Sequence, residues 1–367
     1  MTTSPAAGRA ADVVRALARE PRPAGSDAEA RARAFCTERL RAAGFAVREE
    51  LFEYSSFVGR WGTPIGGVAT LALLLIAHTV ARQGSPLSTL ALLVVGAVAM
   101  VIVGAVAARS GVLTFPAARC RGVDLVATRG TDAPTLWLMA HLDSKSQPVP
   151  ILARAAGVTL VGFTWLASVV LAVAQLWGGD VASWWMPLGV IATIGAIPVI
   201  ATTVGSRSPG ALDNASGVAT VLLAAESTRA PVGVCLTSAE ELGLAGARAW
   251  VRGRARATAL NCDGVDDRGA VTCMYTGAKP VELVDRVVQA ATRAGTSVRA
   301  HRLLPGVLTD GVALADAGWS VVTLSKGGVG TLSRIHSSRD RAELLTGEGI
   351  AEVARVMAEL IDASPEV

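Results

Sequence analysis

The chain has 367 residues, of which 51% are hydrophobic and only 17% are charged, and its mean hydropathy is +0.46. So apolar a balance excludes an ordinary soluble protein of this length, and part of the chain is expected to lie in the lipid bilayer. The net charge of +4 suits a domain held near anionic headgroups; since no basic stripe with interleaved aromatic residues accompanies it, no nucleic-acid partner is expected.

The first polar segment, residues 1–60, predicts two helices followed by a strand. Apolar residues recur at helical spacing over 9–19 and 27–43, and residues 44–54 alternate in polarity as a strand does. The segment lacks the apolar stretch that a signal peptide needs, so the N-terminus is expected to stay untranslocated.

Four long runs without an acidic or basic residue come next, in two pairs that are each joined by a short turn. Each run reaches the ~20 residues that a helix needs to cross a bilayer. Two transmembrane hairpins are therefore expected, at 62–108 and 155–206. The runs are 62–81, 83–108, 155–179 and 181–206.

Positive charges gather at the span ends that adjoin the polar segments, whereas the two turns carry only Arg82. The positive-inside rule then predicts a multi-pass protein of the cell membrane with its polar segments and both termini in the cytoplasm. The sequence leaves open whether the chain forms a homodimer through its spans. The flanking charges are Arg60, Arg109, Lys145, Arg154 and Arg207.

The polar segments 1–60, 109–154 and 207–367 are expected to form one discontinuous domain, large enough to bury a full core. Two strands precede the second hairpin. The alternation of strands and helices that follows predicts an α/β fold with a mostly parallel mixed sheet sandwiched by helices. Ligands should gather beyond the carboxyl ends of its strands.

Four elements are expected directly after the second hairpin. The pattern predicts a helix over 214–228, a strand entering a loop over 231–241, a helix over 247–257 and a strand over 258–265.

Imidazole and carboxylate side chains stand where these strands end. Two Zn²⁺ ions held close together need one bridging carboxylate, and each ion needs an imidazole and a further carboxylate. A sixth group must accept a proton from water and pass it to the leaving amine without binding the ions. The candidates are His141, Asp143, Asp213, Glu240, Glu241, Asp263 and His336.

The motifs HLDS, ALDNASGVA, SAEELGLAG, NCDG and IHSSRD resemble, in that order, the M28 family of zinc aminopeptidases, and RPAGS near residue 22 is similar to the family's N-terminal motif. The resemblance covers most of the polar segments and implies the zinc-exopeptidase fold. It implies one zinc held by His141 and Asp263 and a second held by Glu241 and His336, with Asp213 bridging the two.

The same resemblance implies roles for the remaining polar side chains. Glu240 would be the general base, and Asp143 would orient the imidazole of His141. Asp340 would do similar work for His336.

The sequence also departs from the family's pattern. His141 and Asp213 lie 72 positions apart, so the second hairpin is inserted into the rim of the expected site. Gly311 and Leu314 follow Asp310, the residue assigned to substrate binding, where the family favours His and Phe. HLDSK resembles the glutaminyl cyclases, which share the fold and use one zinc. A strained or cis peptide is implied after Asp213.

These features predict an integral membrane metallo-aminopeptidase with two Zn²⁺, in which Glu240 and Asp263 bind the α-amino group of a peptide. Arg207 is six residues from Asp213, at most about 20 Å of chain, so the site is expected to face the bilayer and to take hydrophobic or membrane-associated peptides. Two alternatives stay open: a glutaminyl cyclase with one zinc, which would release ammonia from an N-terminal glutamine, and a membrane scaffold without activity.

Overall fold

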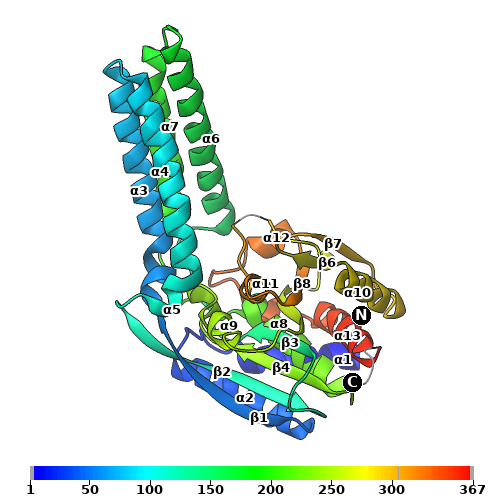
Figure 1. The fold of residues 1–367 in the computed structure, drawn as a ribbon. Helices are drawn as coiled ribbons and strands as arrows, with labels where there is room; N and C mark the ends of the chain where they lie inside the picture. Colours follow the sequence, from blue (N-terminus) through cyan, green and yellow to red (C-terminus); the bar gives the residue numbers. More distant parts are fainter. Residues whose placement is uncertain (1–3, 305, 364–367) are drawn as a thin grey trace. The chain divides into compact units, whose positions relative to one another are not determined.

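The computed structural model describes residues 4–304 and 306–363, which form two compact units (Figure 1). The first unit contains the described residues of Met1–Ser56, Val112–Ser146 and Ser206–Val367, and the second contains Phe57–Gly111 and Gln147–Gly205.

The first unit is built on one mixed sheet of eight strands. They lie in the order β1-β2-β4-β3-β5-β8-β6-β7, and the central run β4-β3-β5-β8 is parallel. Three pairs are antiparallel, β1 with β2, β2 with β4 and β6 with β8, whereas β7 pairs parallel with β6. The strands are β1 (Ala46–Ser55), β2 (Arg119–Arg129), β3 (Leu136–His141), β4 (Val232–Thr237), β5 (Thr258–Val265), β6 (Ala270–Tyr275), β7 (Val298–Arg302) and β8 (Ser320–Gly327). The predicted mostly parallel mixed sheet is confirmed.

Helices cover both faces of this sheet, and alternate residues of β3 show how. Leu138 and Ala140 join the core beneath α1, α2, α8, α10 and α13, whereas Trp137 and Met139 join a second core that includes Trp250 of α9. This division follows from the two-residue period of a strand. The helices and short helical turns are α1 (Pro5–Leu17), α2 (Asp27–Ala42), α5 (Val112–Thr114), η3 (Ala211–Ala215), α8 (Ser216–Ser227), η4 (Glu240–Leu242), α9 (Ala245–Trp250), α10 (Val281–Arg293), α11 (Asp310–Asp316), α12 (Val329–Leu332), η5 (Ala342–Leu344) and α13 (Glu348–Asp362).

Four helices of the second unit are long and apolar enough to cross a membrane (Figure 1). A small buried cluster joins α3, α4 and α7; it consists of Leu74, Ala77, Leu93 and Ala192. Most large apolar side chains of α4 point outward instead, where water would not favour them. The elements are α3 (Ser56–Arg82), α4 (Pro86–Val106), η1 (Ala107–Gly111), α6 (Ile151–Leu176), η2 (Ala182–Trp184) and α7 (Trp185–Ile200).

The elements after the second hairpin agree with the sequence patterns with one exception. β5 coincides with the strand predicted over 258–265. The helix predicted over 247–257 instead ends at Trp250, shortly before Gly253, which adopts a left-handed conformation with φ of 73°. Arg254 donates its Nε–H to the carbonyl of Trp250, which satisfies a carbonyl at the end of the helix.

Candidate metal centre

The carboxyl ends of three adjacent parallel strands bring the predicted site residues together. β3 ends at His141, which pairs with Thr237 at the end of β4, and η4 with Glu240 and Glu241 follows β4. Asp263 lies near the end of β5, on the other side of β3. Parallel strands end at the same edge of a sheet, so their side chains converge there.

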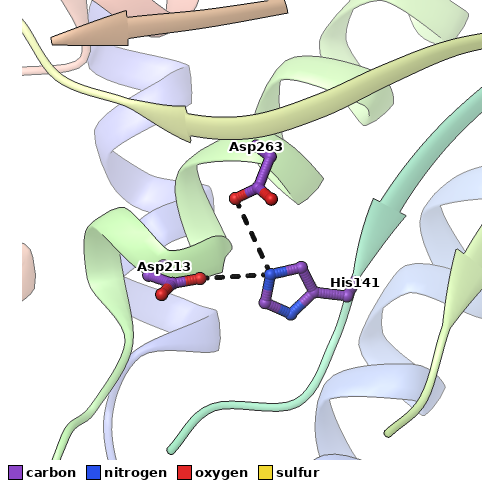
Figure 2. A group of neighbouring side chains, drawn as sticks. All are labelled: His141, Asp213 and Asp263. Atoms are coloured by element: carbon purple, nitrogen blue, oxygen red, sulfur yellow. Dashed lines mark ion pairs between the residues drawn. The ribbon is translucent and has the colours of Figure 1, made fainter. Parts of the chain in front are cut away.

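Two groups of three side chains meet at this edge. In the His141 triad, His141 Nε2 lies 3.1 Å from Asp213 Oδ1 and 3.8 Å from Asp263 Oδ1 (Figure 2). In the His336 triad, His336 Nε2 lies 2.9 Å from Asp213 Oδ2 and 3.3 Å from Glu241 Oε2. Asp213 thus turns one oxygen toward each imidazole.

These spacings fit a metal ion. Donors bound to one tetrahedral zinc at about 2.0–2.2 Å stand roughly 3.3–3.6 Å apart, close to the separations within both triads. His141 Nε2 is buried and has no hydrogen-bond partner among the described residues. Its Nδ1–H donates to the backbone carbonyl of Asp143 at 3.0 Å, which leaves the Nε2 lone pair directed at the carboxylates.

The backbone around Asp213 is held by a second acid. Asp340 accepts hydrogen bonds from the backbone N–H groups of Leu212 at 2.6 Å and Asp213 at 3.1 Å. Asp340 therefore orients the bridging residue, whereas the sequence analysis assigned it to His336. The Asp213–Asn214 peptide is cis, as the resemblance implied. Burial raises the pKa of Asp340 to about 7. Burial acts in the same direction on Asp213, but the two adjacent imidazoles outweigh it and hold the pKa of Asp213 well below its usual value.

Asp143 also differs from its expected role. Its carboxylate lies 3.7 Å from His141 Nδ1, beyond hydrogen-bond distance, and accepts instead the backbone N–H groups of Glu240 at 3.1 Å and Glu241 at 3.2 Å. Its carbonyl, not its carboxylate, orients the imidazole. Asp143 thereby fixes the turn that carries both glutamates.

The Glu240 carboxylate lies beside the two triads without belonging to either. One of its oxygens is 4.0 Å from His141 Nε2, and the side chain is buried. Burial raises the pKa of Glu240 well above its ordinary value, and the neighbouring acids Glu241 and Asp263 add to that rise. A buried acid with a raised pKa can exchange a proton near neutral pH.

Asp310, assigned to substrate binding, is almost completely buried at the start of α11. Its Oδ2 accepts a hydrogen bond from the hydroxyl of Thr237, and its Oδ1 has no partner among the described residues. Burial raises its pKa to about 7. The Asp310 side chain is therefore buried against the end of β4 and is not exposed on a substrate-binding surface.

The sequence analysis missed two basic side chains at this edge. Lys145 Nζ lies 2.5 Å from Glu241 Oε2; the lysine is visible in HLDSK but was interpreted there as a charge flanking a span. The buried Arg22 of RPAGS donates to four backbone carbonyls, those of Leu17, Leu142, Pro209 and Gly210. It joins the segments that follow His141 and precede Asp213.

The comparisons with known proteins agree with this mixed α/β fold. Residues 193–361 match the family model described as Peptidase family M28, and this part of the chain is an M28 peptidase domain. It contains four of the five candidate ligands, and His141 lies before it.

Solved structures share this fold over nearly the whole chain. An aminopeptidase from Aneurinibacillus sp. strain AM-1 is 15% identical with a TM-score of 0.55, covering 97% of this chain and 93% of its own. The Fimbriiglobus ruber glutaminyl cyclase is 14% identical with a TM-score of 0.58, covering 100% and 98%. A zinc aminopeptidase from Bacillus subtilis is 13% identical with a TM-score of 0.55, covering 98% and 95%. None of the curated proteins matches the chain.

Proposed function

We propose that the chain is an integral membrane metallo-aminopeptidase that uses two Zn²⁺ ions to hydrolyse the N-terminal peptide bond of its substrate. The observation that carries the proposal is the shared carboxylate: Asp213 presents one oxygen to His141 and the other to His336, each in a triad completed by a second acid. A bridging carboxylate between two such triads suits a pair of ions.

His141 and Asp263 would hold one ion and Glu241 and His336 the other, with Asp213 binding both. When bound, the ions would polarise the scissile carbonyl and lower the pKa of water. The ring orientation of His141 is set in advance by its hydrogen bond to the carbonyl of Asp143.

Glu240 would move the proton. Its carboxylate adjoins the His141 triad, and its backbone is fixed by Asp143, so it is positioned to accept a proton from the attacking water. Its raised pKa allows it to retain that proton and then to deliver it to the leaving amine. Glu240 and Asp263 are also the acids proposed to bind the substrate's α-ammonium group.

Metal analysis combined with a panel of aminoacyl reporter substrates tests this proposal. The E240Q variant should keep its metal and lose activity by a factor on the order of 10²–10⁴, the usual contribution of a general base. The matched D213N variant should lose both metal and activity. Metal-loaded wild type that is inert toward every aminoacyl substrate, or an E240Q variant of undiminished activity, would refute the assignment.

A glutaminyl cyclase is the second candidate, because Lys145 is paired with Glu241 in one triad and a glutaminyl cyclase shares the fold. Such an enzyme would release ammonia from a peptide with N-terminal glutamine and would contain one zinc per chain. Measuring ammonia and metal content on one preparation separates the two activities.

We further propose that α3, α4, α6 and α7 cross the cell membrane, with the peptidase unit and both termini in the cytoplasm. Their length and apolar composition support this proposal. A cysteine at Gly84, between α3 and α4, should react with an impermeant maleimide in intact cells, whereas one at the exposed Glu20 should react only after lysis. The reverse labelling pattern would show that the peptidase unit lies on the opposite side of the membrane.

Hydrophobic or membrane-associated peptides are the proposed substrates, because only six residues separate Arg207 from Asp213. Liposome-bound reporter peptides should be cleaved faster than soluble ones of the same N-terminal sequence. Equal cleavage rates would contradict this proposal and would leave membrane anchoring as the role of the helices.

A further inference from the structure

The turn that carries Glu240 begins at Ser238, directly after β4, and every polar group of Ser238 is hydrogen-bonded. Its backbone N–H donates to Asp124 Oδ1 at 2.9 Å, and its hydroxyl donates to Glu29 Oε1 at 2.6 Å. Its carbonyl accepts the N–H of Gly246 at 3.1 Å. Because Ser238 is completely buried, water cannot replace these partners, and the three bonds fix the point where the chain leaves the sheet.

The bond between Ser238 and Gly246 closes the turn at its base. A neighbouring bond closes it a second time, from the N–H of Ala245 to the carbonyl of Ala239 at 3.0 Å. A Cβ atom at position 246 would lie 2.4 Å from the carbonyl oxygen of Ser238 and 2.5 Å from Asp124 Oδ1, so this close approach requires glycine. The motif SAEELGLAG therefore needs its first serine and its last glycine as well as its two glutamates.

The backbone of this turn adopts conformations that residues with side chains rarely take. Ala239, immediately before Glu240, has φ of 56°, and Leu244 has φ of 61°. Such conformations persist only where the surrounding structure holds them. Asp143 holds the turn through the N–H groups of the two glutamates, and Ser238 holds its base. Loss of a bond at the base would let the Glu240 carboxylate move.

Two elements that are distant in sequence meet at Ser238. Glu29, from α2, is almost completely buried, and its Oε2 accepts the N–H of Gly25 at 2.7 Å, so it connects the turn to the motif RPAGS. Asp124, from β2, is buried as well. Burial raises the pKa of Asp124 well above its ordinary value, so its neutral carboxyl group accepts the bond from Ser238.

We propose that Ser238 is a positioning residue: held by Glu29 and Asp124, it places the Glu240 carboxylate where it exchanges a proton with the attacking water. This inference rests on the proposed metallopeptidase function, in which Glu240 is the general base. Ser238 acts through Glu240, so its contribution to the rate disappears once Glu240 can no longer accept a proton.

The first test compares the S238A variant with wild type, as full chains in detergent with saturating zinc and an aminoacyl reporter substrate. S238A should lower kcat by on the order of tenfold, because a displacement of about 1 Å can cost up to about 100-fold. KM and the zinc content should stay unchanged. S238A removes a single hydroxyl, so the fold should be retained.

T228V is the matched control. The buried Thr228 precedes β4 and donates its hydroxyl to Asp362 Oδ1 at 2.5 Å, so T228V also removes a buried bond from a hydroxyl to a carboxylate, at the opposite end of the strand. T228V should lower the stability of the chain and leave kcat unchanged.

The decisive measurement combines S238A with E240Q. If Ser238 acts through Glu240, the S238A/E240Q double variant should be no slower than E240Q alone. The Asp124 contact gives a second comparison. D124N keeps an uncharged oxygen acceptor and should retain most of the wild-type kcat, whereas D124L removes the acceptor and should lose kcat as S238A does.

A wild-type kcat in S238A would overturn the inference, as would a further loss of about tenfold when S238A is added to E240Q. It would also be overturned if S238A lost zinc and excess zinc restored its full activity, because the turn would then act through the ligand Glu241. These results would leave the proposed peptidase activity intact. A metal-loaded wild type that cleaves no aminoacyl substrate would refute both.

Discussion

Arg22 offers the most quantitative test of how the site is held together. Its guanidinium donates to the carbonyls of Leu17, Leu142, Pro209 and Gly210 at distances of 2.6–3.0 Å, and only 1% of the residue is exposed. The R22M variant fills much of the same volume and removes every donor. Four carbonyls then lose this donor, and three of them are left without a partner, because the carbonyl of Gly210 still accepts the backbone N–H of Ala215.

The cost follows from the three acceptors left without a partner. At about 1 kcal/mol each, the low end for an unsatisfied buried group, R22M should lower the free energy of unfolding by about 3 kcal/mol. Burying the guanidinium charge is itself unfavourable, as the lowered pKa of Arg22 indicates. R22M removes this unfavourable contribution, which is why the low end of the cost per carbonyl is used.

The measurement is urea unfolding in detergent, followed by tryptophan fluorescence. R15M is the matched control, because Arg15 pairs with Asp12 on the surface with 57% of its side chain exposed. An exposed pair of this kind contributes about 0–1 kcal/mol. If R22M costs no more than R15M, the proposed carbonyl network does not stabilise the segments around the metal ligands.

Three further predictions concern pH, metal and packing. Burial raises the pKa of Glu29 from 4.5 to about 7, so the native state binds this proton more tightly than the unfolded state. The contribution of protonated Glu29 to the free energy of unfolding is complete below about pH 4.5 and is lost as the pH rises to 7. In urea unfolding, the E29Q variant should therefore lose about 3 kcal/mol less than wild type across that interval. Free zinc at about 100 times its dissociation constant should raise the free energy of unfolding by about 2.7 kcal/mol. A chelator should reverse this effect and D213N should lack it; an equal effect of zinc on D213N would contradict the assigned site. A methyl group at Gly217 of α8 would collide with the Asn214 side chain, so G217A should lower the free energy of unfolding by about 1–3 kcal/mol. A methyl group at Gly8 of α1 meets nothing within 4 Å, so G8A should raise it by up to about 1 kcal/mol. Equal effects of the two substitutions would contradict the close contact between Gly217 and Asn214.

The sheet could be predicted because its strands carry their own signal. β5 is a largely buried strand that ends directly before the turn-forming residues 266–269, so its sequence defines its limits without knowledge of its neighbours. The convergence of His141, Asp213 and Asp263 followed from the rule that ligands gather at the carboxyl ends of parallel strands.

The supporting hydrogen bonds could not be predicted in the same way. Asp143 and Asp340 were expected to orient imidazoles, and nothing in the sequence indicated that their carboxylates also accept backbone N–H groups of turns. Which donor a carboxylate meets depends on how a turn packs against a strand, and sequence spacing carries no record of that. Lys145 was misjudged for a related reason, because a lysine near a span satisfies the positive-inside pattern whichever way its side chain points.

The 72 positions between His141 and Asp213 also bear on how the chain assembles. Closing so long a connection costs about 2 kcal/mol more than closing one of roughly eight residues. Here α6 and α7 lie antiparallel, with Gly157 near the start of one against Gly195 and Pro198 of the other, and the connection closes where Ser146 Oγ accepts the N–H of Arg207 at 2.8 Å. If α6 and α7 insert into a membrane as proposed, early insertion during synthesis would bring the two ends of the connection together and remove most of that entropic barrier. Membrane insertion would then also help to assemble the candidate metal centre.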